Sequence, residues 1–468
     1  MMWRSFTSAV KNNDSSFHKR SFHQNVRRVG STVKHFYPSH HSLILLPSIV
    51  YLTMTVLMTT ILLPTSLAWS TEWINLENGI GSSSSFQRIM PPRSGHVAFH
   101  LDDKIFVFGG YAAEQDEQEK GVENRRYPIN DLWVLDPTTK KSDQGWTRLH
   151  GADEANTETA SIPQQRLAAA AVTCQNKEGA VVGLVLGGWD SQEAGTGGVI
   201  LQDLQAYCPS QNTWQKLSFD LQQPTSRLCA VTLTTTDPKK VLVHNHRCTD
   251  HVLILDMEKE SSSSSSSSPL TRQPTTGSPP SPRGLHACVL LPNTTKMVLF
   301  GGAAQDGSMS NEVFVLDTET WEWQAIEAVD NKELEEGEDR RPSPRASPCL
   351  VAIDESTCVL FGGATRSEQG LHGCSDTWLL ELVVGDDDSD NDDCSRVRWT
   401  KLNDDGCPDA PPGRNAASLT RLSFRPAILE GKEVDASVIS DQYFVLSGGW
   451  YPFRTTYNDN YVLKVTKG

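Results

Sequence analysis

Short apolar runs that end in two adjacent glycines recur along the chain, and this recurrence constrains the fold more than any other feature. The runs are apolar at consecutive positions, which is typical of strands buried on both faces. A glycine pair suits a backbone that turns with positive φ in a crowded place. The five pairs are Gly109-Gly110, Gly187-Gly188, Gly301-Gly302, Gly362-Gly363 and Gly448-Gly449. Five such strands in one chain predict a protein built from repeated units.

Each glycine pair stands at the same place in a longer pattern of four short strands. A first strand opens near an arginine that follows a proline by one to three residues, and a third strand follows the glycines. In most units a fourth strand carries a tryptophan, with leucine or isoleucine three residues later. The six arginines are Arg93, Arg166, Arg227, Arg283, Arg345 and Arg414. One four-stranded sheet cannot bury both of its faces alone, so the pattern predicts several copies packed side by side.

The order of glycine pair, third-strand aromatic residue and fourth-strand tryptophan resembles the kelch repeat. This resemblance covers roughly residues 70–468. Kelch units fold as blades of a β-propeller, in which each blade is a four-stranded sheet. The resemblance therefore implies an all-β fold, a six-bladed kelch β-propeller over residues 69–468.

Two units depart from this pattern. The third has Asn245-His246 where the glycines should be, and it lacks its tryptophan, so its fourth strand is expected around Leu270–Gln273. Asparagine tolerates the left-handed conformation, so we expect the turn to survive. The sixth unit ends after its third strand. Trp73–Leu76 has the form of a fourth strand and is predicted to close the ring, which would leave no free edge.

The first 68 residues predict a targeting or membrane segment. Residues 1–42 are basic and are predicted to be a disordered cytoplasmic or targeting segment. Leu43–Leu63 has no charged residue and is long enough to span a bilayer. Residues 43–68 are therefore a transmembrane signal anchor or, because Ser66–Ala68 offers a cleavage site, a signal peptide. Either interpretation places the propeller on the non-cytoplasmic side, as a type II membrane protein or a secreted or lumenal one. Import into an organelle, with residues 1–42 as a transit peptide, stays open.

Charge is distributed unevenly along the chain. The formal net charge is −15, and residues 1–69 carry seven Lys or Arg and one acidic residue. The remaining residues therefore carry −15 − 6 = −21. A surface this acidic argues against nucleic acid or an anionic membrane as a partner of the propeller.

The cysteines and one sequon bear on the compartment. Cys174, Cys229, Cys288 and Cys349 fall within predicted first strands and are expected to be buried free thiols. Three loop cysteines are the better candidates for disulfides on a lumenal side, namely Cys374, Cys394 and Cys407. Asn293 begins an Asn-Thr-Thr sequon in a turn of the fourth unit, and it is a predicted glycosylation site if that side is lumenal.

No catalytic motif is present, and neither a cofactor nor a metal site is predicted. Asp386, Asp388 and Asp390 have the first three EF-hand spacings, but the loop glycine and the closing glutamate are missing, so a solvated loop is expected. An oxidase-type copper site would need two tyrosines and two histidines that converge on the axis. His96 and His286 occupy matching positions, but in units that face each other across the ring. A carbohydrate-active or oxidase-type propeller enzyme remains the alternative function.

The six arginines are the predicted binding residues. One arginine per blade at the start of the innermost strand would form a ring around one mouth of the central channel. In some kelch propellers such arginines hold acidic peptides through bidentate contacts to carboxylates. The structural alternative is that each arginine holds the backbone of its own or a neighbouring blade. The sequence therefore favours a non-enzymatic binding module for a protein or peptide with an acidic motif, or for a glycan.

Overall fold

The computed structural model describes residues 69–76, 90–113, 126–138, 145–151, 162–192, 197–259, 268–329, 341–383, 396–403, 408–427 and 441–467. The chain divides into two compact units, Met1–Ala68 and Trp69–Gly468. The predictions for residues 1–42 and 43–68, and for the acidic loop at 386–393, lie outside the described residues. Within the described ranges, no helix is both long enough and apolar enough to cross a membrane.

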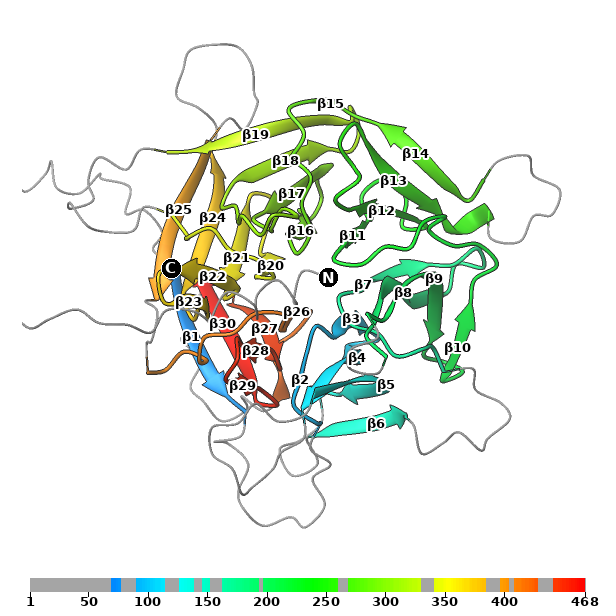
Figure 1. Ribbon diagram of the computed structural model, residues 1–468, viewed down its shortest axis with the longest axis horizontal. Coiled ribbons are helices and arrows are strands. Elements are labelled where there is room, and N and C mark those ends of the chain that lie inside the picture. Colours follow the sequence, from blue (N-terminus) through cyan, green and yellow to red (C-terminus); the bar gives the residue numbers. More distant parts are fainter. Residues whose placement is uncertain are drawn as a thin grey trace, which may run out of the picture. The chain divides into compact units, whose positions relative to one another are not determined.

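Unit Trp69–Gly468 consists of antiparallel four-stranded sheets arranged around a central axis (Figure 1), and it folds as a β-propeller. From the axis outwards, the first sheet contains β3 (Val97–Leu101), β4 (Lys104–Ala113), β5 (Arg126–Leu135) and β6 (Trp146–His150). The second contains β7 (Ala170–Gln175), β8 (Val181–Asp190), β9 (Val199–Cys208) and β10 (Thr213–Lys216). The third contains β11 (Cys229–Thr232), β12 (Lys240–His244), β13 (His251–Asp256) and β14 (Leu270–Pro274).

The remaining sheets follow the same order from the axis outwards. The fourth contains β16 (Ala287–Leu290), β17 (Lys296–Phe300), β18 (Val313–Asp317) and β19 (Glu322–Ala328). The fifth contains β20 (Cys349–Ala352), β21 (Thr357–Phe361), β24 (Thr377–Val383) and β25 (Arg396–Asn403). The sixth contains β26 (Ser418–Leu422), β27 (Asp441–Ser447), β30 (Asn460–Lys467) and β1 (Trp69–Asn75). Strands β19 and β25 also pair with each other, which joins two neighbouring sheets.

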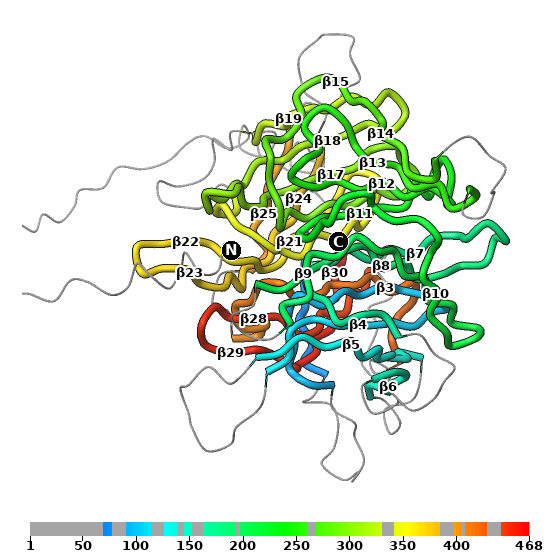
Figure 2. Tube along the Cα trace, turned by 45° about the vertical axis from the view of Figure 1, so that its right-hand side comes forward, coloured from blue at the N-terminus to red at the C-terminus, as the bar shows by residue number. Residues whose placement is uncertain are grey.

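Short elements complete the fold. They are β2 (Arg93–Ser94), β15 (Thr276–Gly277), the β22 (Ala364–Ser367) and β23 (Gly370–Gly373) hairpin, the β28 (Trp450–Tyr451) and β29 (Thr455–Thr456) hairpin, and the 3-10 turn Met257–Lys259. The two hairpins extend beyond the sheets around them (Figure 2).

The core lies between neighbouring sheets, and the second strands are buried on both faces. Val185, Leu242, Leu299, Val359 and Phe444 have no exposed surface. Around the axis each innermost strand contacts the next, and β26 contacts β3, so this series returns to its start. The consecutive apolar residues of the second strands thus reflect burial against a sheet on either side.

The predicted closing strand is confirmed. Strand β1 pairs antiparallel with β30, with Trp73 opposite Leu463, so the two ends of this unit share one sheet. The Trp73 ring packs on Phe361 with 4.8 Å between centroids, and its indole N–H donates to Thr377 Oγ1 at 3.2 Å. Strand β1 therefore supplies an outer strand to one sheet and packs against the neighbouring one.

The glycine pairs are required by close backbone approach. Both Gly109 and Gly110 have positive φ, and a side chain on Gly109 would lie 2.8 Å from the carbonyl oxygen of Arg166.

The expectation for the third sheet is half right. Its fourth strand, β14, lies where predicted, but neither Asn245 nor His246 has positive φ. The Asn245 side chain instead accepts a hydrogen bond from the backbone N–H of Arg247 at 2.8 Å, and this Asx turn replaces the left-handed turn.

Candidate binding face

Five of the six predicted binding arginines are buried and paired with an acidic side chain of their own sheet. The exposed fraction of each is 4% or less. Each carboxylate lies within the third strand or just before it. The pairs are Arg93–Asp131, Arg166–Asp203, Arg283–Glu312, Arg345–Asp376 and Arg414–Asp459.

Arg345 illustrates the geometry of these pairs. Its two terminal nitrogens donate to Asp376 Oδ1 and Oδ2 at 2.6 and 2.9 Å, which is a bidentate contact. One of these nitrogens also donates to the carbonyl of Gly362 at 3.0 Å. The N–H of the next glycine, Gly363, donates to the backbone carbonyl of Arg414 in the following sheet at 2.9 Å. The arginine side chain thus binds within its own sheet, and the backbone hydrogen bond from the glycine pair connects that sheet to its neighbour.

Three of the acidic partners, Asp203, Glu312 and Asp376, have lowered pKa values that agree with this pairing. Burial alone would raise the pKa of Asp203 and Asp376, but the hydrogen bonds and charge of Arg166 and Arg345 bring both below the usual value. A hydrogen bond from Arg283 lowers the pKa of Glu312. These carboxylates are ionised and neutralise the guanidinium groups. The geometry therefore favours the structural alternative for the five arginines over a grip on an external carboxylate.

Arg227 does not occupy the equivalent position, and the expectation of one arginine per sheet is corrected here. The carbonyl of Thr225 accepts the hydrogen bond from Gly188 at 2.9 Å that arginine carbonyls accept elsewhere. Thr225 therefore takes the arginine position in the third sheet. Arg227 lies two residues further on, half-buried and with φ of +59°. The proline–arginine spacing in the sequence could not reveal this shift.

The residue two positions after each such site belongs to a ring of backbone hydrogen bonds around the axis. All of these residues have positive φ, and each N–H donates to the carbonyl of the ring residue in the preceding sheet at 2.7–3.2 Å. In donor-to-acceptor order the ring runs Gly95, Ala416, Ser347, Leu285, Arg227, Ala168 and back to Gly95. Arg227 is thus held by its backbone at the mouth of the channel.

The loops between second and third strands surround this mouth and form what we name the ring face. Four of the five exposed large apolar side chains among the described residues lie on this side: Tyr127, Val199 and Ile200 at the starts of third strands β5 and β9, and Phe453 in the turn of the β28–β29 hairpin. The fifth, Val181, lies at the opposite end of its strand. Exposed arginines on the same loops are Arg247, Arg366 and Arg454. Sequence reasoning missed these residues, although their place between the second and third strands is visible in the sequence.

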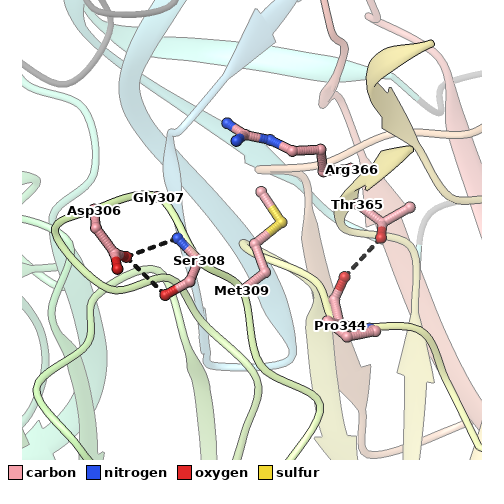
Figure 3. Close-up of a pocket in the computed structure, with 7 residues that line it drawn as sticks. All are labelled: Asp306, Gly307, Ser308, Met309, Pro344, Thr365 and Arg366. Carbon is pink, nitrogen blue, oxygen red and sulfur yellow. Dashed lines mark hydrogen bonds between the residues drawn. The ribbon is translucent and has the colours of Figure 1, made fainter. Parts of the chain in front are cut away.

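A pocket of about 370 Å³ opens on the ring face between two of these loops (Figure 3). Asp306–Met309 line one side, and Pro344, Thr365 and Arg366 line the other. Asp306 accepts hydrogen bonds from the N–H and hydroxyl of Ser308 at 2.9 and 2.7 Å, which holds its loop in a tight turn. Opposite charges on the two sides give the pocket a polar rim above the Met309 side chain.

The remaining predicted residues lie elsewhere. Asn293 is exposed in the β16–β17 turn, with its amide N–H donating to Glu355 Oε1 at 3.3 Å. Cys229, Cys288 and Cys349 carry free thiols, as predicted, although Cys288 is only half-buried. Cys174 and Cys374 are buried, while Cys394 and Cys407 lie outside the described residues. His96 and His286 sit at different blade junctions, and His286 contacts Cys229 and His244.

Comparisons with known proteins agree with this geometry. The family model described as the KLHDC2/KLHL20/DRC7 Kelch-repeats domain matches residues 242–468, and the Kelch motif model matches residues 92–144. Kelch domain-containing protein 2 of Bos taurus is 27% identical over 337 residues, which cover 66% of this chain and 69% of that protein.

Two further relatives match smaller parts. Host cell factor of Drosophila melanogaster is 24% identical over 308 residues, 62% of this chain but 15% of that protein. Kelch domain-containing protein 1 of Mus musculus is 32% identical over 108 residues, 23% of each chain. From the repeat, its strand geometry and these matches, the chain belongs to the kelch-repeat family.

Proposed function

We propose that this chain is a six-bladed kelch propeller that binds a protein partner through its ring face, without catalysis. The blade number rests on two series within the described residues. Six innermost strands contact one another in a closed order, and six residues share the ring of backbone hydrogen bonds. A closed ring of this kind is a rigid support on which the loops of one face vary freely.

The observation that carries the proposal is the collection of exposed apolar residues and arginines on one face. Phe453 is 47% exposed at the tip of the β28–β29 hairpin, beside Arg454, whose guanidinium lies 5.2 Å from the Tyr451 ring centre. Aromatic residues and arginine are enriched in the centres of protein interfaces. Exposed apolar groups gathered mainly on one face of a protein are typical of an interaction surface.

The charge of the face indicates the chemistry of the partner. The propeller as a whole is strongly acidic, and the exposed Arg247, Arg366 and Arg454 add positive charge to the ring face, which favours a negatively charged segment. We propose an acidic protein segment as the partner. This retains the predicted class of ligand but assigns its recognition to exposed loop arginines in place of the buried ones.

The test compares the two faces of the propeller in the full-length protein. Phe453→Ala with Arg454→Glu and Arg366→Glu should remove the partners found by proximity labelling in the native compartment. Val181→Ala with Lys177→Glu makes a matched change on the opposite face and should leave those partners in place. Both variants should melt within a few degrees of the parent, because all the changed residues are exposed or half-buried in loops and strand ends. Equal labelling by both variants would contradict the ring face as the binding site.

We also propose that the propeller lies on the non-cytoplasmic side, as the charge distribution around Leu43–Leu63 predicts. Asn293 is exposed, so it is accessible to glycosylation if that side is lumenal. Asn293→Gln should remove one glycosidase-sensitive mobility step from the full-length protein. Digestion of the propeller by protease added outside sealed microsomes, in which lumenal domains are protected, would overturn this topology.

A further inference from the structure

Three metal-ligating side chains converge at the junction of the third and fourth sheets. Cys229 opens β11, His244 ends β12, and His286 directly precedes β16. All three are buried, and their ligand atoms lie within 4.8 Å of one another. Nε2 of His286 lies 3.1 Å from Cys229 Sγ and 3.0 Å from His244 Nδ1. The three atoms thus face a common point.

This spacing is close to that of a tetrahedral zinc site. Zinc binds nitrogen at about 2.0–2.1 Å and sulfur at about 2.3 Å, which places two ligand atoms about 3.4–3.6 Å apart. The contacts of 3.0 and 3.1 Å and the outer limit of 4.8 Å lie on either side of this value. Small rotations of the three side chains would therefore admit the ion.

Nε2 of His286 is shared between two neighbours. This atom has one proton or one lone pair, so it forms a full hydrogen bond with only one of Cys229 Sγ and His244 Nδ1. A metal ion at the common point would accept a lone pair from each of the three atoms.

The chemistry of these three side chains suits zinc. Zinc binds neutral imidazole nitrogens and cysteine thiolates, so binding would release the proton of the Cys229 thiol.

The other blade junctions provide an internal comparison. Equivalent positions occur at every blade junction. Cys229 corresponds to the residue that opens the first strand of a sheet, and His244 to the second-strand residue paired with it. His286 corresponds to the residue just before the first strand of the next sheet. The other sets are Val97, Phe108 and Ala169; Ala170, Leu186 and Leu228; Ala287, Phe300 and Pro348; Cys349, Phe361 and Ala417; and Ser418, Ser447 and His96. Among these described sets, none besides Cys229, His244 and His286 combines a thiol with two imidazoles.

We propose that Cys229, His244 and His286 bind a zinc ion. The Cys229 thiol would lose its proton to solvent on binding and supply a thiolate ligand. Three protein ligands leave the fourth position of the tetrahedron open. The ion would join β11 and β12 to the next sheet, at the blade whose arginine position is occupied by Thr225.

The test uses full-length protein and residues that the chain itself accepts at these positions. Cys229→Ala, His244→Phe and His286→Ala together convert the cluster to side chains found at the equivalent places in other blades. The parent should contain close to one equivalent of zinc, and cobalt should give the thiolate charge-transfer and tetrahedral visible bands. The triple variant should show neither. His96→Ala with Ser418→Ala, at the equivalent histidine junction, should leave metal content unchanged.

A second measurement covers the case in which the triple variant fails to fold. A zinc chelator should lower the melting temperature of the parent by several degrees, and added zinc should restore it. The single variant His244→Phe should show no such response to chelator. The proposal is overturned if the parent neither holds zinc after reconstitution nor develops the cobalt bands. It is equally overturned if the folded triple variant binds as much metal as the parent.

Discussion

The third sheet and the other five use the same backbone arrangement but different side chains to hold it. In five sheets a buried arginine binds a carboxylate of its own sheet and the carbonyl of a glycine with positive φ. The third sheet has no such arginine and no glycine pair. Nevertheless its inner strand keeps its place in the ring of backbone hydrogen bonds, and Val241, Leu242 and Val243 are as buried as their counterparts. Backbone pairing and apolar packing thus suffice to hold a blade in register.

The arginine and the carboxylate are replaced together in the third sheet. Thr225 stands at the arginine position, and strand register places His251 where the other sheets have their carboxylate. Losing one partner alone would leave an uncompensated buried charge, which costs about 3–5 kcal/mol. Replacement of the pair by two neutral or weakly charged groups avoids that cost. The arginine and the carboxylate therefore stabilise a sheet only as a pair, and the third sheet lacks both.

The largest predicted effect concerns β1, the strand that closes the ring. A chain that begins at Gly79 lacks β1 and leaves β30 and the face of the neighbouring sheet exposed to water. Its free energy of unfolding should fall by on the order of 5 kcal/mol or more, because Trp69 and Trp73 lose their burial together with a row of strand hydrogen bonds. Urea unfolding measures this. An unchanged midpoint would show that closure by β1 does not stabilise the propeller.

The next effect separates the two kinds of sheet directly. Arg345→Met leaves Asp376 buried without its partner and should cost about 3–5 kcal/mol of unfolding free energy. Arg227→Met is the control at a half-buried arginine outside the five buried pairs, and it should cost less than about 1 kcal/mol. Denaturant titration of both variants measures the difference. An equal loss of unfolding free energy in the two variants would contradict a stabilising role for the buried ion pairs.

A smaller effect depends on pH and on a buried histidine at the junction of the sixth and first sheets. Burial and the neighbouring Arg93 lower the pKa of His96 to about 3, against an ordinary value of 6.5. The unfolded chain therefore takes up this proton first as the pH falls below 6.5. The resulting loss of stability at pH 5 is about 2 kcal/mol. His96→Ala should reduce the difference in unfolding free energy between pH 7 and pH 5 by this amount, and an unchanged difference would contradict it.

The smallest effect tests what has replaced the arginine in the third sheet. The Thr225 hydroxyl donates to the carbonyl of Gln223 at 2.8 Å and lies 3.3 Å from a donor nitrogen of Arg247. Thr225→Val removes these contacts from a buried site and should cost about 1 kcal/mol. Thermal unfolding measures it. A loss of unfolding free energy as large as that of Arg345→Met would contradict this prediction, because it would mean that Thr225 stabilises its sheet as much as a buried ion pair.

Much of the fold follows from local patterns in the sequence. The consecutive apolar residues before each glycine pair predict strands buried on both faces, and the Trp-x-x-Leu form of Trp73–Leu76 predicts the closing strand. Both predictions depend on residues close together in the chain. The third sheet was harder to predict, because Asn245 satisfies its turn through a side-chain hydrogen bond that the sequence pattern does not encode.

The sequence by itself determined the repeat, the all-β class and the place of each arginine beside a first strand. It could not determine whether those arginines face solvent, because the acidic partner lies 29–45 residues away and reaches the arginine only through strand pairing. The same reason hides the cluster of Cys229, His244 and His286, which comes from two sheets. Such side chains meet only when the ring closes, so their charge, burial and chemistry are properties of the tertiary structure.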